Sequence, residues 1–192
     1  MKKCFLVLLS AIFICVSLSA CGNSAQQLET TTVVDNTKGT VITEEKNARN
    51  TVPITTNGTA TMTNGSEEIE LTVKEISYES EIDSKSDNMF KQYFKDVDNE
   101  TYLVLKTDIK NIGGNSVNYR FFDSTSVVYE DKYNYKLQPA DIESTVLSSY
   151  WSVDPLKTTE VYFFQSVPDE LKGKAFKATF SAGQNDYVLS GN

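Results

Sequence analysis

The sequence predicts an all-β protein, an antiparallel β-sandwich of seven or eight strands with one short inserted helix. Three observations lead to this prediction. Residues 68–74 alternate polar and apolar side chains without exception, as in a strand with one buried face. Several segments with the same two-residue period follow, separated by turn residues such as the glycine pair at 113–114. All aromatic residues but two lie at or beyond Tyr78, so this part of the chain can build a core.

The N-terminus has the layout of an export signal. Lys2 and Lys3 form a short basic start, residues 4–18 are almost wholly apolar, and small residues precede Cys21. The apolar run is shorter than the roughly 20 residues that a membrane-spanning helix needs. An ordinary cleaved signal fits poorly, because Leu18 would occupy a position that requires a small residue. Residues 18–21, Leu-Ser-Ala-Cys, resemble the lipobox of bacterial lipoproteins. The resemblance implies removal of residues 1–20 and a lipid on Cys21.

Residues 21–65 are predicted to be the lipidated cysteine followed by a disordered, Thr-rich tether. The segment has few large apolar side chains, so it cannot bury enough surface to offset the entropy of ordering the chain. Asn-Gly pairs at 57–58 and 64–65 are typical of tight turns, so the sheet could begin slightly before residue 66. The folded domain is expected over residues 66–192.

The strands of this domain are predicted in order along the chain. The first covers residues 68–78, where a slip in alternation at Lys74–Glu75 indicates a bulge. The second covers residues 103–110, with Leu105 facing inward and Lys106 outward. The segment 160–167 is apolar on both faces, which favours a central strand. The remaining predicted strands are 117–121, 127–129, 133–137, 176–180 and 187–189.

The inserted helix is predicted over residues 89–97. Met89, Phe90, Tyr93, Phe94 and Val97 recur at helical spacing, between the first two predicted strands. Its apolar face is interpreted as closing one side of the sandwich. The alternative is an exposed surface for a partner, carried by Phe90 and Phe94.

Residues 102–111, Tyr-Leu-Val-Leu-Lys-Thr-Asp-Ile-Lys-Asn, resemble the hallmark strand of immunoglobulin-like (telokin-like) domains in Gram-positive lipoproteins of unknown function. Those proteins also share a lipobox, a low-complexity tether and a late apolar strand before a Val-Pro step, matched here by residues 161–168. The resemblance covers about residues 66–190, and the segment 89–97 departs from it. It implies an immunoglobulin-like sandwich on the extracytoplasmic face of the cell membrane, and no catalytic residues.

Composition narrows the function further. The chain has no histidine, which removes the usual general base and the commonest metal ligand. Its net charge is −8, which disfavours nucleic acid as a partner. Cys4 and Cys15 lie in the predicted signal and Cys21 is predicted to be lipidated, so no thiol is left for nucleophilic work. We therefore expect no enzymatic activity and no cofactor.

Two sets of residues are candidates for binding. Tyr150 and Trp151 lie in a polar stretch and could form a platform for a glycan or a protein, although flanking apolar residues favour a core position for Trp151. Asp96, Asp98 and Glu100 form a weak calcium candidate that is read more simply as solvated loop charges, because the full EF-hand spacing is absent.

The function expected from the sequence is a membrane-anchored, non-catalytic binding domain whose partner is an unknown protein or glycan. An alternative is an envelope accessory or structural protein that supports a neighbouring complex through a sheet edge or the helix. A glycan-active enzyme with a carboxylate pair is a distant third, because such pairs come together in space and not in sequence.

Overall fold

The computed structural model describes residues 30–34, 41–45, 48–86, 93–95, 97–144 and 147–192. The chain divides into two units, Met1–Ala48 and Arg49–Asn192. In the first unit, β1 (Thr30–Val34) pairs antiparallel with β2 (Val41–Glu45). The predicted signal and Cys21 lie outside the described residues.

The second unit is almost entirely strand. Its two short 3₁₀ helices are η1 (Tyr119–Phe121) and η2 (Asp169–Leu171). Its fourteen strands, counted over the described residues, are β3 (Asn50–Ile54), β4 (Thr59–Asn64), β5 (Glu67–Glu79), β6 (Glu81–Asp83), β7 (Tyr93–Lys95), β8 (Glu100–Asn111), β9 (Val117–Asn118), β10 (Ser124–Tyr129), β11 (Tyr133–Lys136), β12 (Gln138–Asp141), β13 (Ser152–Val153), β14 (Thr158–Pro168), β15 (Phe176–Ala182) and β16 (Asn185–Gly191).

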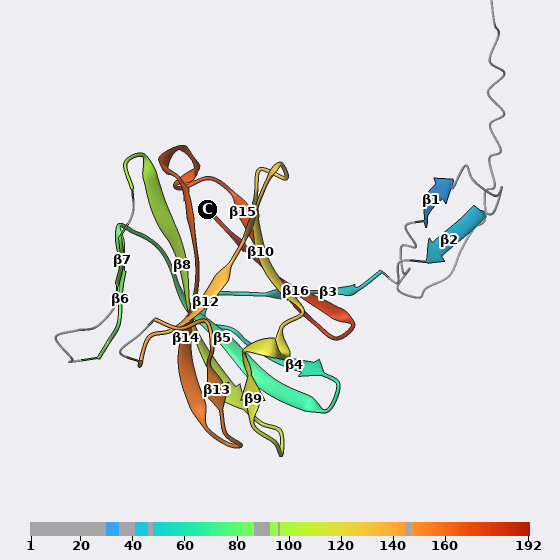
Figure 1. Cartoon of the computed structure of the whole chain (residues 1–192), viewed down its shortest axis with the longest axis horizontal. Helices are drawn as coiled ribbons and strands as arrows, with labels where there is room; N and C mark the ends of the chain where they lie inside the picture. The colour runs from blue at the N-terminus through green and yellow to red at the C-terminus, as the bar shows by residue number, and fades with distance from the viewer. Residues whose placement is uncertain (1–29, 35–40, 46–47, 87–92, 96, 145–146) are drawn as a thin grey trace, which may run out of the picture. The chain divides into compact units, whose positions relative to one another are not determined.

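Ten of these strands form two five-stranded sheets that pack as a β-sandwich (Figure 1). The first sheet has the order β11-β10-β15-β16-β3, and the second has the order β12-β14-β8-β5-β4. Every pairing is antiparallel except that of β3 with β16. The predicted all-β sandwich is confirmed. The strand count exceeds the predicted seven or eight because β3, β4, β6, β7, β12 and β13 were not predicted. Of these, β6, β7 and β13 have only two or three residues, too few to show a periodic pattern.

The core lies between the two sheets. On β8, Leu103, Leu105 and Ile109 are fully buried, which confirms the predicted inward face of this strand. The rings of Phe163 on β14 and Phe180 on β15 meet edge to face across the layers, with centroids 5.1 Å apart. β14 lies between β12 and β8, so the prediction that this apolar segment is an interior strand is also confirmed.

The predicted bulge is present in β5. Its pairing with β8 shifts register between Val73 and Glu75, as the slip in alternation indicated. After the bulge, Ile76 and Tyr78 turn back towards the core. The Tyr78 hydroxyl then lies 3.2 Å from the hydroxyl of Tyr129, which is buried on the opposite sheet.

The sandwich begins earlier than residue 66. β3 and β4 lie within the segment predicted to be tether, and the compact unit begins at Arg49. Met62 on β4 is fully buried and pairs with Ile69, while Val52 on β3 packs against the core. Both are edge strands whose outward positions are mostly threonine, so their composition resembles that of a polar linker.

The predicted helix over 89–97 is not found. Tyr93–Lys95 is the strand β7, which pairs with β6, and residues 87–92, including Phe90, lie outside the described residues. Phe94 packs on the outer face of the second sheet, with its ring centroid 5.3 Å from that of Phe164. This tertiary contact outweighs the local helical spacing. The predicted strand 117–121 is likewise shorter: β9 ends at Asn118, whose side chain caps η1.

The outer face of the second sheet also carries a network of ion pairs centred on Glu160. Its carboxylate accepts hydrogen bonds from Lys85 (2.8 Å) and Lys74 (2.9 Å), and Lys74 also pairs with Asp108. Burial alone would raise the pKa of Glu160, but the two lysine hydrogen bonds outweigh it and hold the pKa below its ordinary value. Because the folded-state pKa is depressed, this stabilisation is present at neutral pH and is lost as pH falls through the lowered pKa.

We expect Glu160→Gln to lower the melting temperature at pH 7, because it leaves two lysines without their shared partner. The difference from wild type is expected to shrink as the pH is lowered through the acidic range, since the wild-type carboxylate then becomes protonated. Thermal melts at several pH values measure this. Glu170→Gln, at an exposed carboxylate, is the control. A difference that stays constant with pH would contradict the ion-pair account.

We expect deletion of residues 22–48 to leave the melting temperature of the second unit nearly unchanged, whereas deletion of residues 22–63 lowers it by several degrees. The longer deletion removes β3 and most of β4, and with them the buried side chain of Met62. Thermal unfolding followed by circular dichroism distinguishes the two deletions. Equal melting temperatures for both would show that these strands contribute nothing to the core.

Candidate binding pocket

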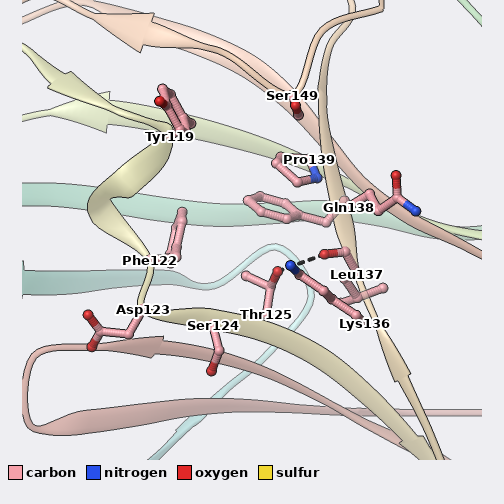
Figure 2. Close-up of a pocket in the computed structure, with 11 residues that line it drawn as sticks. Tyr119, Phe122, Asp123, Ser124, Thr125, Lys136, Leu137, Gln138, Pro139 and Ser149 are labelled. Carbon is pink, nitrogen blue, oxygen red and sulfur yellow. Dashed lines mark hydrogen bonds between the residues drawn. The ribbon is translucent and has the colours of Figure 1, made fainter.

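A pocket with a volume of about 410 Å³ lies where the chain passes from one sheet to the other. β11 belongs to the first sheet and β12 to the second, and Leu137 joins them. The Leu137 amide donates to the carbonyl of Thr125 (3.1 Å), and the Thr125 hydroxyl donates back to the carbonyl of Leu137 (2.8 Å; Figure 2). These two bonds fix the crossing against the start of β10.

One wall of the pocket comes from the end of η1 and the start of β10, and the other from the β11–β12 crossing. The lining residues are Tyr119, Phe122, Asp123, Ser124, Thr125, Lys136, Leu137, Gln138, Pro139, Ser149 and Phe163. The lining is partly apolar, because Phe122, Leu137, Pro139 and Phe163 all contribute to it. The Phe122 and Phe163 rings meet edge to face at 5.4 Å, which holds this surface in a defined shape.

The two charged side chains of the pocket differ in their surroundings. Asp123 is neutralised, because one carboxylate oxygen accepts from Arg49 (2.8 Å) and the other from the side-chain amide of Asn64 (3.3 Å). Lys136 is exposed and its side chain has no hydrogen-bond or ion-pair partner among the described residues, as is also the case for Lys95, Lys157 and Lys172. Of these four lysines, Lys136 is the one that lines the pocket, which therefore combines apolar side chains with one unpaired positive charge.

An aromatic rim borders the pocket. Tyr119, a lining residue, packs edge to face against Tyr150 with ring centroids 4.6 Å apart. The guanidinium of Arg120 lies 5.5 Å from the centre of the Tyr119 ring. Tyr150 itself is 68% exposed, which is unusual for so large a side chain and makes it available to a partner.

The structure separates Tyr150 and Trp151, which the sequence placed together as one candidate. Trp151 is only 2% exposed and belongs to the core, as its flanking apolar residues favoured. Its ring centroid lies 6.2 Å from that of Phe122, so it supports the pocket wall from behind. Its indole nitrogen has no partner among the described residues. A role for Trp151 as an exposed glycan platform is not compatible with this burial.

The other candidate residues do not come together into a site. Phe94 is half-buried on the far side of the second sheet, against Phe164. Of the calcium candidate, Asp96 lies outside the described residues, Asp98 is exposed, and Glu100 accepts a hydrogen bond from Ser166. Within the described ranges, no group of three or more acidic or thiol side chains is arranged to hold a metal ion.

The pocket residues Tyr119, Phe122 and Lys136 were not identified from the sequence. Tyr119 lies in the predicted strand 117–121 but is the first residue of the 3₁₀ helix η1, and Phe122 directly follows that helix. Lys136 occupies an outward position in a predicted strand, as most lysines do. Its distinguishing property is its place in the lining of the pocket, and this depends on the tertiary fold.

Comparison with known proteins identifies the fold and no activity. A crystal structure of an uncharacterized β-sandwich protein from Clostridium difficile matches 78% of this chain and 99% of its own, with a TM-score of 0.62 and 21% identity. A conserved hypothetical protein from Bacillus anthracis matches 63% of this chain and 86% of its own at 14% identity, but its TM-score of 0.44 supports no conclusion. No protein-family model matches the chain, and neither does any curated protein sequence. Over the residues described, no helix is long and apolar enough to cross a membrane.

We expect Trp151→Ala to reduce the free energy of unfolding by about 3–5 kcal/mol, because it empties a large buried site behind Phe122. Tyr150→Ala, one residue earlier, is expected to change stability by less than about 1 kcal/mol, because the side chain is mostly in solvent. Urea denaturation of both variants measures the difference. Similar losses at the two positions would contradict the separation into a core residue and a surface residue.

Proposed function

We propose that the protein is a lipid-anchored, extracytoplasmic lipoprotein that displays a non-catalytic, immunoglobulin-like binding domain. The pocket beside the β11–β12 crossing, with exposed Tyr150 at its rim, is the surface through which this domain engages its partner. The observation that carries the binding role is the open, partly apolar pocket with an unpaired Lys136.

The proposed location on the extracytoplasmic face of the membrane is supported by the sequence. A basic start, an apolar run too short to span a bilayer, and Leu18-Ser19-Ala20-Cys21 are what a lipoprotein signal requires. A single acyl chain binds a membrane only marginally, so a diacylglyceryl group on Cys21 is needed for stable anchoring. The segment between Cys21 and Arg49 then separates the membrane surface from the sandwich.

The proposal that the sandwich is immunoglobulin-like is supported by the topology of its two sheets. Two antiparallel sheets pack face to face, with the N-terminal β3 parallel to the C-terminal β16 and the β11–β12 segment crossing between the sheets. Immunoglobulin-like domains pack two such sheets, with functional loops at their ends. The non-catalytic assignment is supported by the absence of histidine from the sequence and by the predicted loss of every free thiol.

We expect Cys21→Ser to move the protein from the membrane fraction to the medium, or to leave unprocessed precursor, because the residue that carries the lipid is lost. Cell fractionation together with the intact mass of the wild-type protein measures this. The proposed anchor would be contradicted if the wild type and the variant appeared in the same fraction and the wild type carried no acyl mass.

The binding half of the proposal is tested with the full lipidated protein in detergent, incubated with envelope fragments from cells that lack it. Tyr150→Ala is expected to reduce retention on the fragments, while Tyr133→Ala, at a less exposed surface tyrosine on β11, is expected to leave it unchanged. Equal retention of the Tyr150→Ala variant and wild type would contradict a role for the pocket rim.

A further inference from the structure

The interior of the pocket combines two chemical features. Phe122, Phe163, Leu137 and Pro139 supply an apolar surface, and the ammonium group of Lys136 is the one charged group of the lining without a partner among the described residues. The volume of about 410 Å³ falls within the range of about 300–1,000 Å³ that is typical of small-molecule sites. A ligand that matches both features carries one negative charge on an apolar body.

The other polar groups around the pocket do not point to a neutral sugar. Figure 2 shows the carboxylate of Asp123, the hydroxyl of Ser124 and the amide of Gln138 directed away from the side chain of Phe122. Asp123 is also already bound by Arg49 and Asn64. The Thr125 hydroxyl is used by Leu137. Few directed hydrogen-bonding groups are left for the hydroxyls of a sugar ring, which would then lose their water without replacement.

Two other cavities among the described residues lack this combination. The cavity between β3 and β4, of about 210 Å³, has no charged residue in its lining. The cavity at the start of β15, of about 180 Å³, contains Lys177, but that lysine is paired with Asp131 at 2.8 Å. The edge of β11 is also a poor template for an added strand, because the strand has four residues and is flanked by charged lysines.

We propose that this pocket binds a carboxylate carried on an apolar, preferably aromatic, body, with the carboxylate at Lys136 and the body against Phe122 and Phe163. The inference rests on the proposed binding role and names the ligand chemistry of that same pocket. Such a group occurs in free aromatic or branched organic acids and at the C-terminal residue of a peptide. A charge-assisted hydrogen bond from the lysine supplies selectivity for the ionised acid.

The test uses the full-length protein in detergent and the fluorescence of Trp151, which is the only tryptophan in the chain and contacts the pocket wall. The probes are 3-phenylpropionate, its uncharged amide, and acetate, which has the charge without the apolar body. We expect 3-phenylpropionate to bind at least about tenfold more tightly than either of the other two. Equal binding of the acid and the amide would overturn the proposal.

Lys136→Gln removes the positive charge from the pocket, and Lys136→Arg retains it. Lys136 holds no ion pair among the described residues, so both variants are expected to melt like wild type. Lys136→Gln is expected to weaken 3-phenylpropionate binding about fivefold to tenfold, and Lys136→Arg is expected to weaken it much less. The matched control is Lys157→Gln, at an exposed lysine outside the pocket. Unchanged binding by Lys136→Gln would overturn the proposal.

The source of the acid is distinguished with N-acetyl-glycyl-phenylalanine and the same peptide carrying a C-terminal amide. Tighter binding of the peptide acid than of 3-phenylpropionate assigns the pocket to a peptide C-terminus, and weaker binding assigns it to a free acid. Membrane fractionation of the Cys21→Ser variant is independent of these measurements. Failure of the anchor and failure of the ligand assignment are therefore separate results.

Discussion

The crossing of the chain from the first sheet to the second at Leu137 is the constraint on which the pocket depends. The two backbone groups of Leu137 bond to Thr125, in a buried position where an unmade hydrogen bond is costly. This pair holds the residue that joins the two sheets against β10 of the first sheet. Lys136 precedes this residue and Gln138 follows it, and both line the pocket together with Phe163.

The surrounding structure supports this arrangement from both sides. Behind the pocket, Trp151 packs against Phe122, which in turn meets Phe163 and Phe180 in the central core. On the outer face of the second sheet, a second buried apolar cluster includes Val104 and Phe164, and the ion pairs around Glu160 lie on the same face. The described outer face of β8 and β14 is thus occupied by internal contacts, whereas the lining of the pocket includes the unpaired Lys136.

Much of the sandwich could be predicted from the sequence because its long strands have one buried face. The inward residues of β8, the bulge in β5 and the interior position of β14 all follow from alternation or its interruption. The edge strands β3 and β4 were missed because their outward positions are threonines and only Met62 is fully buried. The helix predicted over 89–97 was wrong for residues 93–95, which form the strand β7. Phe94 on this strand packs against Phe164, and a contact between residues so far apart in the chain is not visible in local spacing. The pocket could not be predicted, since the lack of a partner for Lys136 appears only when the sheets are assembled.

We propose that the ligand binds at the β11–β12 crossing. The most direct measurement is the change in backbone amide NMR signals of the full-length protein when 3-phenylpropionate is added. We expect the shifts to be concentrated in residues 119–125 and 136–139, on the two walls of the pocket. Shifts that fall instead on the outer face of β5, β8 and β14, or on the cavity between β3 and β4, would contradict it.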